Sequence, residues 1–511
     1  MIKTPTSNKQ PSQSEVQPLL NLINSGQLAQ AEMLAKTLIN HYPNTFILHN
    51  VLGIALDGLG KVKEAITSYR NALGLQPSMP DLHFNLAIAL TNTGELDAAA
   101  ASYRKAIALN PKFFEAYGNL GTLLQKQGKL EEAIASYRKA ININPDARGY
   151  FNLATALRDE GRLENAITSY QKAIELFPNY VDAYNNLGET FRDQGHMDLA
   201  VKNYQIALGM NPQHASANYN IAEFLYLAKK FDEAIPHFER SQLDDWQSRS
   251  MYCLYKAEHF DTFKTKLDEL VNTTPHTAPF LATLSTHYAV NFGVEDTYNF
   301  CKNGFDFVHQ TAIPELVEPN STLLNQLLDD IKNTEIATRA QGMLFNGKQS
   351  AGNLFKRPEA SFRTLGELVK REFINYKNKF AGADCELIKS FPSELEFTSS
   401  WYVRMRRGGY VDKHIHEVGW ISGAVYLAIP KRENPTDGCF EYGIHGDNYP
   451  QKHDNFPVGI ATPSVGDIVL FPSSLFHRTI PFTADEERIC IAFDLKPAMD
   501  LEGSLKVSSS Y

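Results

Sequence analysis

Three histidines near the C-terminal end have the residue type and spacing of metal ligands. His414 and His416 stand two residues apart in GGYVDKHIHEVGWISG, and His477 follows in GDIVLFPSSLFHRTIPF. Residues two apart on a β-strand point to the same face, so both imidazoles can reach one ion. A third ligand from a distant strand completes a facial cap that leaves metal positions open for substrate, cosubstrate and dioxygen. We therefore expect these three residues to be metal ligands and the catalytic residues of an oxygenase.

The order of these residues resembles the jelly-roll 2-oxoglutarate and iron(II)-dependent dioxygenases, in which a His-x-acid pair, a distal His and then Arg or Lys follow one another. The segments GKQSAGNLF, WYVRMRRGGY, HIHEVGWISGAVYL and FPSSLFHRTIPF are also similar to a bacterial family of oxygenases that often stands behind tetratricopeptide repeats, and the likeness covers about residues 340–497. The resemblance implies Fe(II) and 2-oxoglutarate as cofactors. It also implies that Arg488, which opens RICIAFDL, binds the far carboxylate of 2-oxoglutarate with its fork of donors.

The sequence departs from that pattern at His416, where the family has Asp or Glu. Glu417 is adjacent but points to the opposite strand face, so it replaces the acid only if the strand bulges. Three histidines also resemble cupin metal sites, and Gly408 and Gly466 have the cupin spacing, although the cupin glutamate is missing around Trp420. One alternative is thus a three-His cupin-type dioxygenase acting on a small molecule without 2-oxoglutarate. Another is a repeat scaffold with an inactive oxygenase-like domain.

Residues upstream of the ligands are candidates for holding the cosubstrate. Tyr402, Arg404 and Arg406 alternate along one predicted strand and share one of its faces. If that face is internal, we expect Tyr402 and Arg404 to bind the cosubstrate. The alternative is an exposed face of salt bridges.

Four other polar residues lie near these motifs. Ser422 either allows close packing behind the ligand strand or bonds to a ligand imidazole. Asp494 is expected simply to finish the last strand. His445 and His453, in the loop EYGIHGDNYPQKHDN, are expected to be exposed to solvent.

Short strands are expected to position the site. From about residue 395, SWYVRMRRGG, GAVYLAIP, DIVLFP and RICIAFDL are separated by turns rich in Gly, Pro, Asn and Asp. Before them, LLNQLLDDIKN and SFRTLGELVKREFINYKNKF have the apolar spacing of amphipathic helices. This pattern predicts a double-stranded β-helix, or jelly roll, with flanking helices over residues 323–500.

The N-terminal half repeats with a period of 34 residues, with one step of 33. The period is carried by a glycine, a proline, an alanine and an aromatic series. The glycines are Gly26, Gly60, Gly94, Gly128, Gly161 and Gly195, and the aromatic residues are Tyr69, Tyr103, Tyr137, Tyr170, Tyr204 and Phe238. Each unit is typical of two amphipathic helices with a turn at the glycine, and it resembles tetratricopeptide repeats. About seven units are expected over residues 15–241.

An asparagine series follows the same period on the first helix of each unit. Its members are Asn85, Asn119, Asn152, Asn186 and Asn220, while the first full unit has Val51. This column resembles the asparagine ladder of the O-linked N-acetylglucosamine transferase superhelix. Such amides can grip an extended peptide backbone on a concave surface, so a peptide or protein partner is expected. The alternative is that the asparagines merely face water.

Composition excludes other classes of protein. The 511 residues include 49 basic and 58 acidic ones without a dense basic block, so neither nucleic acid nor an anionic membrane is an expected partner. There is no run of about 18 apolar residues and no export signal in MIKTPTSNKQPSQSE. The five cysteines are scattered and lack CxxC spacing, which favours a reducing cytoplasm.

These observations predict a multidomain α + β protein. Its expected order is a disordered tail (1–14), an all-α tetratricopeptide superhelix (15–241), a helical connector (242–322), the oxygenase-like jelly roll (323–500) and a second tail (501–511). We expect a dioxygenase that uses Fe(II) and 2-oxoglutarate to hydroxylate a peptide or protein substrate gripped by the repeats.

Overall fold

The computed structural model describes residues 10–243, 245–334, 336–339, 342–392, 395–417 and 419–497. The chain divides between Phe224 and Leu225 into two compact units. Residues 1–9 and all of 501–511, which belong to the expected tails, lie outside the described residues.

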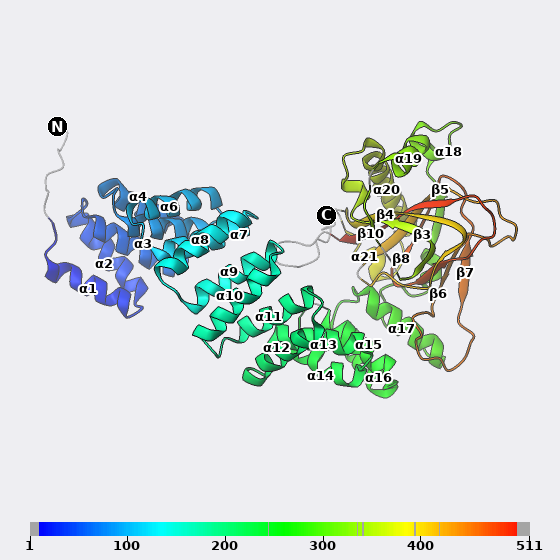
Figure 1. Ribbon diagram of the computed structural model, residues 1–511, viewed down its shortest axis with the longest axis horizontal. Coiled ribbons are helices and arrows are strands. Elements are labelled where there is room, and N and C mark those ends of the chain that lie inside the picture. Colours follow the sequence, from blue (N-terminus) through cyan, green and yellow to red (C-terminus); the bar gives the residue numbers. More distant parts are fainter. Residues whose placement is uncertain are drawn as a thin grey trace. The chain divides into compact units, whose positions relative to one another are not determined.

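The first unit is a stack of paired helices (Figure 1). They are α1 (Gln13–Asn24), α2 (Leu28–His41), α3 (Phe46–Gly58), α4 (Val62–Leu75), α5 (Pro80–Asn92), α6 (Leu96–Leu109), α7 (Phe114–Lys126), α8 (Leu130–Ile143), α9 (Ala147–Asp159), α10 (Leu163–Leu176), α11 (Val181–Asp193), α12 (Met197–Met210) and α13 (Ala215–Leu227), the last of which crosses the division. The predicted all-α repeat architecture is confirmed.

Glycines have two different roles in these helix pairs. The periodic glycines of the turns, such as Gly60 and Gly128, adopt φ values of 76° and 74°, which residues with a Cβ rarely adopt. A second set lies inside the first helices, where a Cβ on Gly121 would come within 2.7 Å of the Tyr137 ring. The first set therefore serves the backbone, and the second makes room for the periodic tyrosine.

The single 33-residue step shortens a turn. Helix α9 is 13 residues long, as α7 and α11 are, so no helical residue is lost. Asp146 precedes α9 and its side chain accepts a hydrogen bond from the Gly149 amide at 2.6 Å. This cap allows the helix to start one residue earlier after the proline.

The second unit begins with helices and ends with strands. Its helices are α14 (Phe231–Ser241), α15 (Trp246–Lys256), α16 (Phe260–Thr273), α17 (Pro279–Phe292), α18 (Pro314–Val317), α19 (Thr322–Asn333), α20 (Ala360–Lys379) and α21 (Glu386–Lys389), with 3₁₀ turns η1 (Gly304–Phe307) and η2 (Leu354–Lys356). Helices α15 and α17 pack against the long loop of residues 444–457. This part of the expected connector therefore forms part of the second compact unit.

Two histidines of that loop correct a prediction. A 2.9 Å hydrogen bond joins the rings of His445 and His287, which belongs to α17. His453 bonds to the Val290 carbonyl at 3.1 Å. Both rings are partly buried rather than exposed. The polar composition of the loop predicted exposure to solvent. The helix that covers these two histidines lies more than 150 residues earlier in the chain, so the loop sequence gives no sign of it.

The strands form two antiparallel sheets. They are β1 (His309–Ala312), β2 (Thr338–Arg339), β3 (Leu344–Ser350), β4 (Leu395–Val411), β5 (Ile421–Ala428), β6 (Phe440–Gly443), β7 (Val458–Ala461), β8 (Asp467–Pro472), β9 (Phe476–Thr479) and β10 (Arg488–Pro497). The larger sheet has the order β1-β8-β5-β10-β4-β3-β2, and the smaller has β7-β6-β9. The predicted strand-rich C-terminal region with flanking helices is confirmed.

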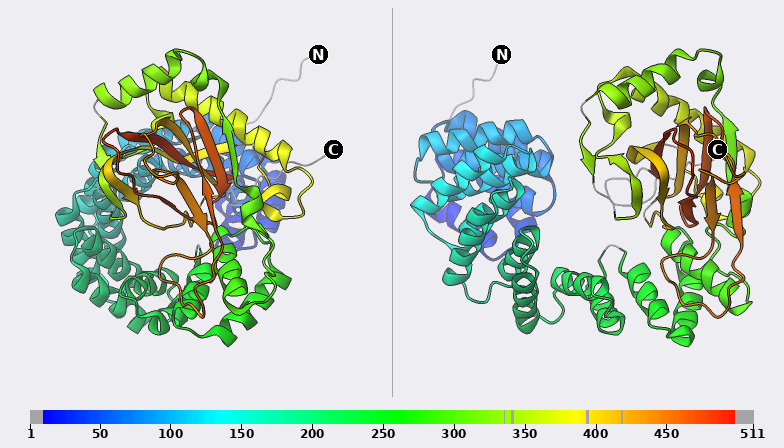
Figure 2. Two further views of the ribbon diagram at one scale, coloured as in Figure 1. Left: turned by 90° about the vertical axis from the view of Figure 1, so that its right-hand side faces the viewer. Right: turned by 45° about the vertical axis from the view of Figure 1, so that its right-hand side comes forward.

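Alternate residues of the larger sheet face opposite cores. Val403, Tyr426 and Cys490 belong to a buried cluster that also includes Phe440 of the smaller sheet. On the other face, helix α20 lies along the strands (Figure 2), where its Phe373 contacts the ring of Phe493 on β10. The space between the two sheets is therefore an interior into which every second residue of β4, β5 and β10 points.

The cysteines form no disulfide bond within the described residues. All five cysteines lie within the described residues, where they are buried free thiols. In the part of the chain that the structure describes, no helix is both long and apolar enough to cross a membrane.

Candidate metal centre

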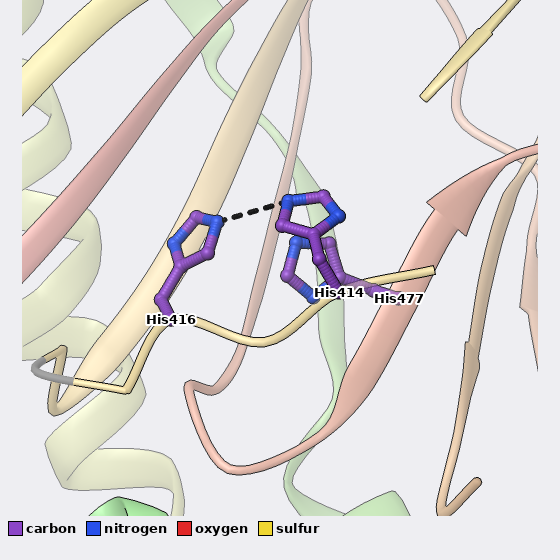
Figure 3. Close-up of side chains that lie close together, drawn as sticks. All are labelled: His414, His416 and His477. Carbon is purple, nitrogen blue, oxygen red and sulfur yellow. Dashed lines mark hydrogen bonds between the residues drawn. The ribbon is translucent and has the colours of Figure 1, made fainter. Parts of the chain in front are cut away.

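The three predicted ligands meet between the sheets. One ring nitrogen from each of His414, His416 and His477 lies within 4.8 Å of the others, and Figure 3 shows the three imidazoles gathered together. The Nε2 atoms of His414 and His416 are 3.2 Å apart. Two neighbouring ligands at 90° on an octahedral ion need about 3.0 Å if the metal–nitrogen bonds are about 2.1 Å. The spacing therefore fits a shared metal ion.

Hydrogen bonds at the opposite ring nitrogens prepare these imidazoles for ligation. The Nδ1 atom of His414 lies 2.8 Å from the Asp412 carbonyl, and that of His477 lies 3.2 Å from the Leu475 carbonyl. A carbonyl only accepts, so each Nδ1 carries the proton and each Nε2 presents a lone pair. His416 has the same arrangement, but its Nδ1 bonds to the carboxylate of Asp494.

Backbone pairing positions the early and the late histidine together. The amide of His414 donates to the His477 carbonyl at 3.1 Å, and the amide of His477 donates to the His414 carbonyl at 2.9 Å. Strand β4 stops at Val411, so His416 lies in an irregular segment rather than on a strand. The expected strand geometry for the His-x-His pair is therefore wrong, although the two rings still converge.

A bulge explains the glycines that precede the ligands. The pairing of β3 with β4 jumps from Phe345↔Tyr410 to Gly347↔Met405, which leaves extra residues on β4. Gly408 within this bulge has φ of 72°. A Cβ on Gly409 would lie 2.6 Å from the Arg406 carbonyl. The bulge re-aims the end of β4 toward the His477 strand.

Burial keeps two of the three imidazoles, those of His414 and His477, neutral. Burial, with a further contribution from nearby His416, lowers the pKa of His414 to about 4. Burial also holds the pKa of His477 well below its usual range. The uncharged ring is the form that binds a metal ion, so these ligands are ready near neutral pH.

Asp494 has a role that the sequence reasoning missed. Its Oδ1 accepts from His416 and from the Ser422 hydroxyl at 2.7 Å, and its Oδ2 accepts from the Ser399 hydroxyl at 3.1 Å. Burial raises the pKa of this carboxyl, but His416 and these hydrogen bonds outweigh it and lower the pKa below its ordinary value. Ser422 also lies 3.0 Å from the His416 Nδ1, as one of its two predicted roles required.

Arg488 is a buried cation that points into the same interior. It is 1% exposed, donates to the Gly438 carbonyl at 2.9 Å and lies 5.0 Å from the centre of the Tyr426 ring. Among the described residues, no carboxylate forms an ion pair with it. The buried Tyr426 hydroxyl likewise has no hydrogen-bond partner within that part of the chain. Burying a cation without an anionic partner costs free energy. Arg488 and the Tyr426 hydroxyl together therefore indicate a place for an external anion.

The cavity between the sheets connects the histidines with this cation. It has a volume of about 70 Å³ and is lined by His414, His416, His477, Trp401 and Arg488, among others. Aromatic and aliphatic side chains make up much of the remaining wall. A molecule bound here must be slender, with one end near the imidazoles and an anionic end at Arg488.

The structure does not bring Tyr402 and Arg404 to this cavity. Trp401, Val403 and other odd-numbered residues of β4 line it, so even-numbered residues point away. Arg404 instead forms an ion pair with Glu487 at 2.7 Å, which is the salt-bridging alternative. Glu417 also lies outside the cluster and pairs with Arg249 at 2.9 Å.

Family models match both halves of the chain. A model described as "Putative 2OG-Fe(II) oxygenase" matches residues 399–494, which include all three histidines, Arg488 and Asp494. Tetratricopeptide-repeat models match residues 50–112, 114–146, 154–195 and 185–248. The chain joins tetratricopeptide repeats to a domain of this oxygenase family.

The solved structures similar to the chain include two that are described as tetratricopeptide-repeat proteins. The crystal structure of MamA is 26% identical over 32% of this chain and 95% of MamA, with a TM-score of 0.31. YrrB, described as a repeat protein with an unusual peptide-binding site, is 21% identical over 36% and 95%, with a TM-score of 0.33. A repeat protein from Parabacteroides merdae is 18% identical over 47% and 98%, with a TM-score of 0.39. No curated protein matches the chain.

A groove that includes His414 lies beside the candidate metal centre. It has a volume of about 360 Å³ and runs from His414 past Tyr449 to Tyr226, Tyr252 and Phe280. A larger depression of about 650 Å³, between α17 and the loop that follows it, contains none of the three histidines. The groove is therefore the opening that adjoins the candidate site.

The asparagine series occupies one position in the tetratricopeptide helices. Each of the five is the sixth residue of its helix, as Val51 is of α3. Asn85 donates to Asn50 at 3.0 Å, while Asn220 is buried and bonds to Asn185 and Glu189. The amides of this column are thus partly used within the repeats themselves.

Proposed function

We propose that the C-terminal domain is a 2-oxoglutarate- and Fe(II)-dependent dioxygenase that hydroxylates a peptide or protein segment held by the repeats. One observation supports this most directly. Three imidazoles with Nε2 lone pairs line the same narrow cavity as Arg488, which has no acidic partner among the described residues.

Each residue has a definite task in this proposal. His414, His416 and His477 hold the iron, and Arg488 binds the far carboxylate of 2-oxoglutarate with the Tyr426 hydroxyl as an additional donor. When bound, these cofactors supply the oxidising chemistry, in which dioxygen and 2-oxoglutarate give succinate, carbon dioxide and one hydroxyl group on the substrate. Trp401 and the apolar wall exclude water from the reaction.

The dimensions of the site favour a substrate that binds from outside. A cavity of about 70 Å³ leaves no room for a large molecule beside the cosubstrate. The outer groove is five times larger and carries aromatic side chains together with Lys413 and Lys256. A side chain of a peptide can enter from this groove while its backbone remains outside.

The repeats supply the second part of the proposal. Asn119 and Asn152 line a groove of about 110 Å³ between α7 and α9 with Glu115 and Arg148. Side-chain amides there can pair with a peptide backbone whatever its sequence. The acidic net charge of −9 disfavours nucleic acid as the partner, and five buried free thiols suit the cytoplasm that we propose.

The decisive experiment measures cosubstrate turnover by the full chain. We expect purified protein supplied with Fe(II) to convert 2-oxoglutarate slowly to succinate, and a peptide library to contain sequences that accelerate it. Hydroxylated peptide would then be identified by mass spectrometry. A protein that binds iron but forms no succinate with or without peptides contradicts the proposal.

One observation favours a second candidate. Among the described residues, the donor set consists of three imidazoles without an acid, which resembles three-His cupin dioxygenases. Such an enzyme would consume dioxygen with a small molecule in the absence of 2-oxoglutarate, and replacing Arg488 would matter little. A protein that binds no metal at all would instead be a repeat scaffold with an inactive domain.

A further inference from the structure

We propose that Asp494 supplies, through the His416 ring, the negative charge that a carboxylate ligand brings to a two-histidine, one-acid iron site. This inference rests on the proposed function, because it concerns how the same three imidazoles hold their metal ion. It gives Asp494 the role of a positioning and charge-donating residue, since the carboxylate touches a ligand and not the metal.

The surroundings of Asp494 show a carboxylate held in place for this task. Its Oδ1 accepts from His416 and Ser422, and its Oδ2 accepts from Ser399. A further hydroxyl, that of Ser473, lies 2.7 Å from Ser422 and continues the chain of hydrogen bonds. The Asp494 side chain is only 15% exposed, so water screens its charge weakly.

The negative charge of Asp494 is not balanced by a lysine or arginine among the described residues. Among the described residues, no lysine or arginine forms an ion pair with Asp494, and its one potential cationic partner is His416. The two serines are neutral donors. A buried carboxylate of this kind is costly unless a positive charge lies nearby. The place for that charge is the far side of the His416 ring, where the three Nε2 atoms converge.

The other two ligand rings provide an internal comparison. His414 and His477 bond through Nδ1 to backbone carbonyls, which carry no net charge. His416 alone bonds to a carboxylate. It also occupies the position where the resembling oxygenases have their acidic ligand. The three ligand side chains include no carboxylate. Asp494 supplies a negative charge on the Nδ1 side of the His416 ring, next to the position where the resembling oxygenases have their acidic ligand.

Strand register explains why this residue can reach the site. Asp494 lies six residues after Arg488 on β10, so both side chains point to the same interior face. Asp494 pairs in register with Ser422 of β5 and Ser399 of β4, the two serines that hold it. One strand thus presents the anion-binding arginine at its start and the charge-donating aspartate near its end.

The test separates charge from position with two variants of the full chain. In Asp494→Asn, the amide oxygen still accepts from His416 and Ser422, and the amide nitrogen donates to the Ser399 hydroxyl, which can rotate. Asp494→Ala removes both charge and contact. We expect Asp494→Asn to bind Co(II) 10- to 100-fold more weakly than the wild type, and Asp494→Ala at least as weakly.

Metal binding can be followed without activity. Trp401 lies 5.8 Å from the His416 ring, and all three tryptophans belong to the second unit, so Co(II) titration is read from quenching of tryptophan fluorescence. Asp485→Asn is the matched control, because Asp485 forms an exposed ion pair with Arg407. We expect that variant to bind Co(II) like the wild type.

The outcomes distinguish this inference from the proposed function. A wild-type protein that fails to bind Co(II) contradicts the metal site itself. If the wild type binds and Asp494→Asn binds equally well, the site stands and the charge proposal is overturned. Should Asp494→Asn not fold, ¹⁵N-histidine NMR of the Zn(II)-loaded wild type decides. The Nδ1 proton of His416, assigned with His416→Gln, is expected downfield of the other two, and coincident resonances overturn the inference.

Discussion

The repeat unit and the oxygenase unit distribute their important residues in opposite ways. In the first unit each structural task recurs with the period, so Gly121 and its Tyr137 have counterparts in Gly53 with Tyr69 and in Gly188 with Tyr204. In the second unit each task at the candidate metal centre is performed once, by residues as distant in sequence as Ser399 and Asp494, which lie 95 positions apart. A repeat array therefore spreads the cost of a substitution over many equivalent positions, whereas the candidate metal centre concentrates that cost at a few.

The largest expected effect comes from removing one metal ligand. His477→Ala deletes one of three donors, so we expect Co(II) affinity to fall more than about 100-fold and succinate formation to disappear. His83→Ala in the repeats is the matched control, because among the described residues the one hydrogen bond of the His83 ring is to the Pro77 carbonyl. Both variants are measured by fluorescence titration and by 2-oxoglutarate turnover. Equal behaviour of the two variants would remove the contrast between the units.

The next effect concerns the buried arginine. Arg488→Met preserves the bulk of the side chain but removes its charge. Because a charge-assisted hydrogen bond to the carboxylate is lost, KM for 2-oxoglutarate should rise about 10- to 100-fold. Metal affinity should not change. Arg404→Met is the control, since Arg404 pairs with Glu487 away from the cavity. A larger KM effect from Arg404 than from Arg488 would restore the sequence-based expectation for Arg404.

The sequence predicted what is periodic or fixed by a short motif. The 34-residue period gave the helix pairs, and His414, His416 and His477 were recognisable by type and spacing. The sequence carried a signal for the face of β4 as well, because Trp401, Val403 and Met405 alternate with more polar residues. That alternation places Arg404 on the outer face, whereas residue type alone assigns an arginine to the carboxylate of a cosubstrate.

Other features depend on register and were beyond the sequence. Asp494 contacts His416 only because β10 pairs with β4 and β5 in one particular alignment. His445 and His453 are covered by α17, which the loop sequence cannot reveal. The end of β4 at Val411 depends on pairing across the bulge rather than on composition. Long-range pairing, rather than local preference, separates the predicted features from the missed ones.

A smaller effect is expected inside the repeats. Gly121→Val would force a side chain into the Tyr137 ring, so the first unit should lose about 1–3 kcal/mol of unfolding free energy. Gly118→Val is the control on the same helix, because a Cβ there meets nothing within 4 Å and Val is no poorer a helix former than Gly, so stability should change by less than about 1 kcal/mol. Urea unfolding followed by circular dichroism measures the loss. The tryptophan signal of the second unit should not move, and a shared transition would show that the units unfold together.

The smallest effect tests a buried histidine of the second unit away from the metal. Burial lowers the pKa of His287 to about 3, with nearby His445 contributing, whereas an unfolded histidine titrates near 6.5. The unfolded chain therefore binds the extra proton as pH falls below about 6.5, and stability declines toward pH 3 by at most about 1.4 kcal/mol per pH unit. In His287→Gln, which retains hydrogen-bonding groups toward Tyr255, this part of the decline should be absent. Urea unfolding at pH 7.5 and 5, read from tryptophan fluorescence, gives the change of unfolding free energy with pH for the wild type and the variant. If the two changes are equal, His287 is protonated in the folded protein as readily as in the unfolded chain.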